Sequence, residues 1–365
     1  MSVDPAAALP RTIDAADWPE LSYRLGLTDG LPTFPPERGA VARLVAASGR
    51  AGDERIGVIP PAGRVATVEA VAANAVMAGC LPEHFPIVLL ALELLLEPRF
   101  NLAGVVTTTH PCWPLVIVSG PVVRALGMAT RESVFNGGGA RANLAIGRAI
   151  RLVTWNLGDA RPRQPVQEIM GHPGRMAYCI AEETDASPWT SFAASRGVEA
   201  GASAVTVFAC EGPQICNPWG VATPDGARVG ERWLEMVADQ MRARGNSNTH
   251  TLGEILVVFN PAMARTLGRE GWSRARIQAF LWEKARRRLG DIRVHPDGRP
   301  NVDLDARYAW WPEWIDQRDP DAMIPVAWSP ESIHVLVAGG DSIPAAAICP
   351  SWGHLGGFAQ TRALA

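Results

Sequence analysis

The sequence has 365 residues, of which 47% are hydrophobic and 19% charged, and its formal net charge is -3. This composition is typical of a globular protein and excludes a disordered chain. The small negative charge argues against a nucleic-acid partner, because binding to phosphates needs an excess of positive side chains. The most apolar run, Ile87 to Leu96, contains Glu93 and is too short to cross a bilayer. It therefore predicts a buried helix and no membrane partner.

The N-terminal residues show no basic region followed by an apolar stretch, so we predict no secretory signal and a cytoplasmic protein. Six cysteines lie far apart, which is typical of reduced thiols rather than of a disulfide framework: Cys80, Cys112, Cys179, Cys210, Cys216 and Cys349. Lysine occurs once, as Lys284, which argues against Schiff-base chemistry with pyridoxal phosphate. No cofactor is predicted.

The first half of the chain alternates apolar segments with turn residues. Residues 1–55 are rich in Pro, Ala and Gly and predict an N-terminal arm with a short helix. Apolar residues over 68–76 repeat with helical spacing, and a proline suits the start of a second helix over 82–96. The segments Ala103–Thr109 and Leu115–Ser119 are rich in Val, Ile and Thr, and they predict two strands.

Two segments resemble each other within the chain. Residues 115–127 and 256–268 each contain an apolar run, a tight turn, a Pro that suits a helix start and a Leu-Gly pair. A polar loop and a long helical segment follow each of them, over 141–155 and 274–288. From this pattern we infer a divergent internal duplication.

Further apolar strands are predicted at Ala204–Ala209 and Ile333–Ala338. Strands that alternate with helices predict an α/β fold, in which duplicated strand-helix units form mixed sheets covered by helices. We divide the chain into the arm at 1–55, a first α/β half at 56–200 and a second α/β half at 201–365. Ligands of such folds collect at the carboxyl ends of strands, and most of the polar residues singled out below are predicted to lie there.

Residues 291–330 interrupt this alternation with aromatic residues among prolines, namely Tyr308, Trp310, Trp311 and Trp314. This Trp-rich excursion predicts a lid or a subunit contact, and we expect a homo-oligomer. The basic residues Lys284 and Arg286–Arg288 are predicted to form the solvated face of a helix.

The densest group of reactive residues lies around Cys80, with Glu83 and His84 beyond it. A thiol just before a helix start feels the positive end of the helix dipole, so we expect Cys80 to ionise easily and to act as a nucleophile. Glu83 and His84 could supply a base. The alternative is a buried cysteine where two helices meet.

A second group follows a predicted strand, where Thr109 and His110 would deliver a hydroxyl donor and a general base to the edge of the sheet. Histidine before proline is also an ordinary loop residue. The third group is a glycine run that leads into a helix, and its exposed amides would suit an anionic part of the substrate: Asn136, Gly138, Arg141 and Asn143. The run matches neither the phosphate-binding loop nor the dinucleotide fingerprint, and its glycines could simply relieve crowding.

Two further groups pair cysteines with acidic residues. Cys179 precedes Glu182, which could orient a histidine or a substrate amine, and Cys210 precedes Glu211. The sequence contains no CxxC pair and no HExxH motif. A metal site is therefore not predicted, although a metal ion held by residues distant in the sequence stays open.

Several long segments together resemble the UGSC family of (seleno)proteins, a family of bacterial proteins named for a selenocysteine or cysteine motif: TDGLPTFPP, ATVEAVAANAVMAGCLPEHFP, TTTHPCWPLVIVSGP, GARANLAIGRAIRLV, GHPGRMAYCIAEETDASPW and HVLVAGGDS. They are spread over most of the chain. The resemblance implies a thiol- or selenol-based centre at Cys80 or Cys179. The chain departs from the family name in lacking a Cys-Gly-Ser-Cys tetrapeptide, and no resolving cysteine stands next to Cys80.

These patterns predict an enzyme that acts on a small polar metabolite by cysteine-dependent nucleophilic or redox chemistry at the interface of the two halves. Cys80 would be the nucleophile or a redox thiol, and His110 or His84 its acid-base partner. Glu83 would be the orienting carboxylate, and Arg141 with the glycine run would anchor an anion. A lyase or hydrolase that uses His and Glu, with or without a metal, is the first alternative. A non-catalytic small-molecule binder or a scaffold subunit is the second.

Overall fold

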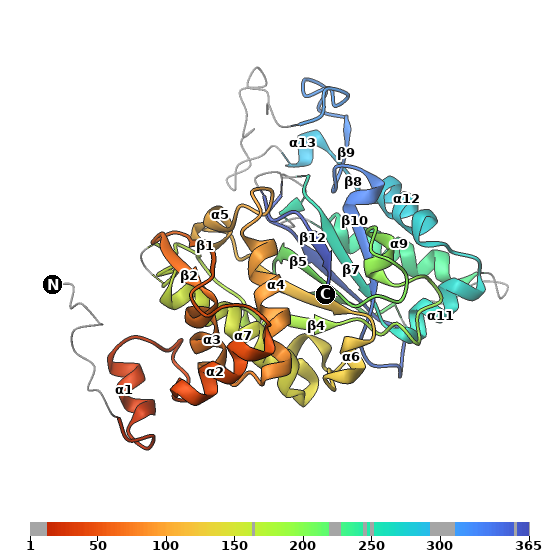
Figure 1. The fold of residues 1–365 in the computed structure, drawn as a ribbon. Coiled ribbons are helices and arrows are strands. Elements are labelled where there is room, and N and C mark those ends of the chain that lie inside the picture. Colours follow the sequence, from red (N-terminus) through yellow and green to blue (C-terminus); the bar gives the residue numbers. More distant parts are fainter. Residues whose placement is uncertain are drawn as a thin grey trace.

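The computed structural model describes residues 13–162, 165–218, 228–243, 247–248, 252–292, 311–353 and 356–364. Within them the chain forms two four-stranded mixed sheets with helices around them, which establishes the α/β class (Figure 1). The first sheet has the order β12 (Gln360–Ala363), β5 (Ala204–Cys210), β3 (Trp113–Ser119), β4 (Cys179–Ala181). The second has the order β10 (Ile333–Val337), β7 (Ile255–Phe259), β11 (Ala346–Pro350), β6 (Gln214–Cys216).

The two sheets share a pattern of pairing. In the first, β3 pairs in parallel with β4 and antiparallel with β5, and in the second β7 pairs in parallel with β10 and antiparallel with β11. In each sheet the parallel partner comes before the antiparallel partner along the chain. This likeness agrees with the proposed duplication, which itself stays a prediction.

Both faces of the central strand of the second sheet are covered. Along β7, Ile255, Val257 and Phe259 belong to one hydrophobic core, whereas Leu256 and Val258 belong to the other. Alternate residues of a strand point to opposite faces, so a strand that is apolar at every position fits burial on both sides. The run Leu256 to Phe259 therefore has the composition that its place in the fold requires.

Helices of the first half gather at one side of the molecule (Figure 1). Thr67 begins α3 by accepting a hydrogen bond from the amide of Ala70, and α4 is apolar almost all round and buried, as predicted for this segment. The bounds of the helices in this half are α1 (Trp18–Arg24), α2 (Arg38–Ala47), α3 (Val68–Met77), η1 (Pro82–His84), α4 (Phe85–Leu95), α5 (Leu102–Thr107), α6 (Val122–Ala125), η2 (Val134–Gly139), α7 (Arg141–Asn156), η3 (Pro173–Met176) and α8 (Phe192–Ser195). A separate hairpin joins β1 (Arg55–Ile59) to β2 (Arg64–Thr67).

Helices of the second half lie at the opposite side of the molecule, beside the second sheet (Figure 1). Asn260 begins α11 and Ser273 begins α12, each by accepting a backbone amide hydrogen bond through its side chain. The bounds are α9 (Val229–Met241), α11 (Pro261–Arg269), α12 (Arg274–Lys284), α13 (Leu289–Ile292) and η5 (Pro330–Ser332), and the small sheet of β8 (Arg286–Arg288) and β9 (Met323–Pro325) lies near α13.

Two predicted elements are wrong. The segment Ala103–Thr109 lies mainly in helix α5, because Asn101 caps its start and Leu102, Val105 and Val106 are buried with helical spacing. Arg286–Arg288 form strand β8 rather than the face of a helix, since the helix ends at Lys284 and the arginines pair with β9.

The predicted boundary between residues 200 and 201 does not separate the two sheets, because β5 and β12 complete the first sheet. The sheets also contact each other directly. The amide of Glu183 donates to the carbonyl of Val337, and an isolated bridge joins Cys210 to Ser351. The second half thus contributes strands to both sheets.

In the Trp-rich excursion, Trp311 is buried and Trp314 packs edge-on against Trp282. Tyr308 and Trp310 lie outside the described residues.

None of the helices in the described ranges is both long enough and apolar enough to cross a membrane.

Candidate functional site

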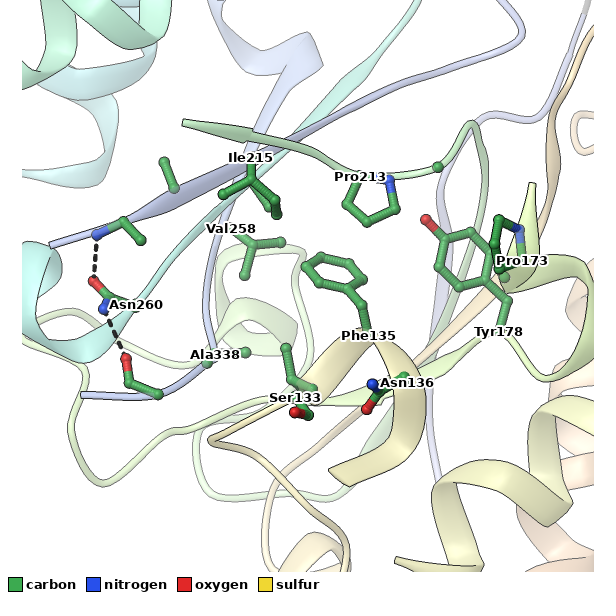
Figure 2. A pocket seen from close by; sticks show the side chains of 18 of the residues that line it. Ser133, Phe135, Asn136, Pro173, Tyr178, Pro213, Ile215, Val258, Asn260 and Ala338 are labelled. Atoms are coloured by element: carbon green, nitrogen blue, oxygen red, sulfur yellow. Dashed lines mark hydrogen bonds between the residues drawn. The ribbon is translucent and has the colours of Figure 1, made fainter. Parts of the chain in front are cut away.

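A cavity of about 700 Å³ lies at the carboxyl ends of β7 and β10, the parallel pair of the second sheet (Figure 2). This is the place where open α/β sheets bind ligands. Its walls are mostly apolar, with Phe135, Pro213, Ile215, Val258 and Ala338. Its polar side chains are Ser133, Asn136, His172, Tyr178 and Asn260.

Asn260 shapes one end of this cavity through its side-chain amide. Its Oδ1 accepts hydrogen bonds from the amides of Met263 and Ala345, and its Nδ2 donates to the carbonyls of Gly340 and Ile343. Figure 2 draws the bonds of Asn260 to the other residues that line the cavity. The side chain thereby joins the end of β7, the start of α11 and the loop before β11. Because all of its hydrogen-bonding capacity is used, Asn260 positions the wall rather than binds a ligand.

His172 lines the cavity just before the short helix η3. Its ring contacts Tyr178 edge-on, with 5.1 Å between the ring centroids. Both ring nitrogens are buried, and neither has a hydrogen-bond partner among the described residues. Burial lowers the pKa of His172 to about 4, although the nearby carboxylate of Glu211 raises it in part. At neutral pH the imidazole is therefore uncharged, with one donor and one acceptor to offer a ligand.

A pair of residues predicted from the sequence, His110 and Glu211, lies beside His172. The Nε2 atom of His110 is 2.7 Å from Oε1 of Glu211, and the hydroxyl of Ser247 donates to that oxygen. The hydroxyl of Tyr178 donates to the backbone carbonyl of Glu211 at 2.8 Å. Glu211 thus links the imidazole of His110 to the residues at the wall of the cavity.

Cys80 belongs to a different cavity, of about 300 Å³, which Phe34 and Arg141 also line. Its thiol is buried and donates to the carbonyl of Ala145 at 3.4 Å. Burial raises the pKa of Cys80, and the positive charge of Arg141 offsets this only in part. The expectation that Cys80 ionises easily is therefore wrong, because the loss of hydration outweighs the favourable position before a helix.

The residues that were predicted to act with Cys80 have structural roles instead. Nδ1 of His84 accepts the amide of Leu81, and burial lowers the pKa of His84 while the exposed carboxylate of Glu83 partly opposes this. Arg141 donates from Nε to the carbonyl of Gly79 at 2.8 Å. In this structure Arg141 thus holds the turn before Cys80.

The remaining predicted residues are divided among several places. Asn136 lines the large cavity, whereas the side chain of Asn143 is bonded in both directions to the backbone of Ala129. Gly138 has a φ of +53° in the turn before α7, and a Cβ there would lie 2.7 Å from that of Ala129, so the glycine is required by the backbone. Thr109 accepts the amide of Ile169 through its carbonyl.

The pair Cys179 and Glu182 lies at β4. Cys179 is buried within the strand, and burial raises the pKa of its thiol. Glu182 follows the strand and lines a third cavity, with one carboxylate oxygen accepting the amide of Phe192. The predicted residues therefore do not form one site.

Sequence reasoning missed His172, Tyr178 and Asn260. A signal for Asn260 existed, because Asn before Pro at the end of an apolar strand is typical of a helix N-cap. His172 gave only a weak signal, as a histidine before Pro-Gly in a polar loop.

No group of three or more His, Cys, Asp or Glu residues is arranged to hold a metal ion within the described ranges. Comparisons with protein-family models, with curated proteins and with solved structures find no match. The resemblance to the UGSC family therefore stays a prediction.

Proposed function

We propose that the protein is an enzyme that acts on a small molecule with an apolar body and a polar end, bound in the large cavity between β7, β10 and η3. The observation that carries the proposal is the neutral imidazole of His172, which lines a cavity of about 700 Å³ and whose two buried nitrogens have no hydrogen-bond partner among the described residues. A buried polar group without a partner is costly, so its retention at a cavity wall favours a role in binding or catalysis.

The chemistry that these residues support is acid-base catalysis in a hydrolase or lyase. Neutral His172 would accept a proton from a bound water or from the substrate. The carboxylate of Glu211 raises the pKa of His172, so it would stabilise the imidazolium that forms. His110, at 2.7 Å from Glu211, would hold that carboxylate in place.

The test is a thermal-shift screen of a small-metabolite library, followed by mass spectrometry of any stabilising compound after incubation with the protein. Ile215→Asp places a charge on the cavity wall at a side chain that is 55% exposed, so the fold should survive and binding should be lost. Ile169→Asp, at an exposed isoleucine that does not line the cavity, is the matched control.

His172→Gln separates catalysis from binding. We expect it to lower kcat by about a hundredfold or more while KM changes little, because it removes the base and leaves the wall. A compound that binds wild type and is never converted would instead favour the non-catalytic binder. Binding that Ile215→Asp and Ile169→Asp affect equally would contradict the assignment of the cavity.

Cysteine-dependent chemistry remains a second candidate because Cys80 lines its own cavity together with Arg141. Limited labelling of the native protein with iodoacetamide, followed by peptide mapping, tests it. Rapid labelling of Cys80 that slows in acid would support a thiol centre, as the resemblance to the UGSC family implies. We expect slow labelling, since all six cysteines are buried.

A further inference from the structure

A separate cavity of about 570 Å³ lies at the carboxyl ends of β3 and β4 in the first sheet. It occupies the position that the large cavity occupies in the second sheet, beyond the parallel pair of strands and before the antiparallel neighbour of that pair. Residues of the turn after β3, of the segment after β4 and of the segment before β5 line it, as their counterparts around β7, β10 and β11 line the first cavity.

Glu182 lines this cavity directly after β4 and is only 2% exposed. Its Oε1 accepts the amide of Phe192 at 2.6 Å, its Oε2 is buried, and the side chain of Ser119 also forms a hydrogen bond with the carboxyl group. Burial raises the pKa of Glu182, and the hydrogen bonds with Ser119 and Phe192 and the charge of Arg274 offset this only in part. The carboxyl group of Glu182 is therefore buried without a directly bonded cation among the described residues.

Arg274, the basic residue whose charge acts on Glu182, is engaged elsewhere. The guanidinium of Arg274 donates to the carbonyl and hydroxyl of Thr190 and to the carbonyl of Val335. Arg274 therefore fixes the segment beside the cavity and acts on Glu182 through its charge.

The other charged residues that line the cavity already have partners. Glu183 accepts from the hydroxyl of Thr130 at 2.6 Å and is paired with Arg131 at 3.0 Å. Asp185 is paired with Arg124 at the exposed rim. Three acidic side chains and one basic side chain line the cavity, and Glu182 is the acidic one without an ion pair among the described residues.

We propose that this cavity is a second ligand site, which binds a small molecule carrying a protonated amine, and that the ammonium group pairs with Oε2 of Glu182. An ammonium group would supply the missing cation and hydrogen-bond donors together. The hydroxyls of Thr184 and Ser191 offer further acceptors, and Val123 and Met128 offer an apolar wall for a short carbon chain. The site is independent of the reaction proposed for the large cavity.

The test uses the full chain and ligand-observed NMR titration with n-propylammonium and with 1,3-diaminopropane in its doubly charged form. The probes of similar size that lack the positive charge are n-propanol and propionate. We expect saturable binding of the amines, and binding of n-propanol and propionate that is weaker by about tenfold or more, because a charge-assisted hydrogen bond in a buried site is lost. Equal binding of all four probes, or no saturable binding of either amine, would overturn the proposal.

Two variants locate the binding. Glu182→Gln keeps the acceptor for the amide of Phe192 and removes the charge, so amine affinity should fall by about tenfold or more. Ala200→Trp fills the cavity from an exposed position, so it should abolish amine binding. This variant tests the site even if the loss of charge in Glu182→Gln disturbs the fold. Asp185→Asn at the rim is the matched control and should change the affinity by less than about threefold. Amine binding that survives both Glu182→Gln and Ala200→Trp would contradict the proposal. Ile215→Asp, which changes the other cavity, should leave the affinity for the amine unchanged.

Discussion

His172 shows how burial can outweigh a neighbouring charge in setting the protonation state of a side chain. Its folded pKa of about 4 lies below the value of 6.5 for a free imidazole, and the first cause is the loss of hydration. Between these two pH values the unfolded chain binds a proton that the native protein does not. Stability therefore rises with pH across this window, and the free energy of unfolding falls as the pH drops from 6.5 towards 4.

We expect His172→Gln to flatten this dependence. The difference between the pKa values corresponds to about 3 kcal/mol in total, of which about 2 kcal/mol is reached by pH 5. Urea unfolding of wild type and variant at pH 7.5 and pH 5 measures it. If both proteins lose the same free energy of unfolding between these pH values, folding does not lower the pKa of His172.

Asn260 illustrates a polar residue whose role is to join backbone segments. Asn260→Ala would leave two amides and two carbonyls without partners at a position that is only 6% exposed. We expect a loss of about 2–4 kcal/mol in the free energy of unfolding. Ser273→Ala is the control, because the side chain of Ser273 accepts the N-cap bond from the amide of Arg276 and no other side-chain bond among the described residues, so its loss should cost about 1 kcal/mol. Equal costs in chemical denaturation would show that the loop before β11 does not depend on Asn260.

At the scale of elements, the contact between α7 and the segment just before β4 depends on one glycine. A Cβ on Gly147 would lie 2.6 Å from the carbonyl carbon of Ala177 and 2.7 Å from the amide nitrogen of Tyr178. These are backbone atoms, so relief requires the helix to move away from this segment. Helix α7 therefore packs on the residues that lead into β4 at a distance that a side chain would not allow.

Gly147→Ala sets two effects against each other. The helix propensity of Ala favours the variant by about 1 kcal/mol, whereas overpacking against backbone costs about 1–3 kcal/mol or more. At 2.6 Å the clash should prevail, so we expect a net destabilisation of about 1–2 kcal/mol and a lower Tm. Gly39→Ala in α2 is the control, since its nearest neighbour would be an arginine tip at 3.7 Å. A stabilised Gly147→Ala protein would contradict the close approach.

At the scale of the whole molecule, a buried polar cluster ties the two sheets together. Oε2 of Glu254 lies 3.1 Å from Nε2 of His334 on β10 and accepts the amide of Ala359 at 2.7 Å. Arg196 contacts Nδ1 of His334 and donates to Thr361 on β12. The cluster thus joins the edge strand of the first sheet to the edge strand of the second.

Glu254→Gln tests this connection. Burial by itself would raise the pKa of Glu254, but the neighbouring His334 and the amide of Ala359 hold it below its usual value. The stability that this carboxylate contributes is present above pH 4.5 and is lost as the pH falls through the lowered pKa. At pH 7 we expect the variant to lose about 2 kcal/mol or more. Glu97→Gln, which removes an exposed pair with Arg362, should cost less than about 1 kcal/mol, and similar losses would contradict a special role for the cluster.

Much of the fold followed from local signals in the sequence. The apolar β-branched runs at β3, β5, β7 and β10 predicted strands, and the prolines predicted the helix starts at Pro82, where η1 leads into α4, and at Pro261, where α11 begins. The strand order could not be predicted from the sequence, because β12 and β5 pair across 150 residues or more and no local sequence signal indicates their register. The segment at α5 was misassigned because its Val and Thr content outweighed the helical spacing of its buried residues.

The candidate site shows more clearly which features follow from local sequence signals and which depend on tertiary contacts. The sequence by itself determined that Glu211 follows an apolar strand and that Asn136 lies in a glycine turn, because turn and strand signals depend on near neighbours, whereas His110 follows helix α5 and not the predicted strand. Only the tertiary structure decided that His110 meets Glu211, that His172 stands beside them, and that Cys80 and Glu182 line separate cavities. It also reversed the expected ionisation of Cys80. The reason is physical: hydration, pairing and pKa depend on groups that are close in space, and those groups come from segments far apart in the chain.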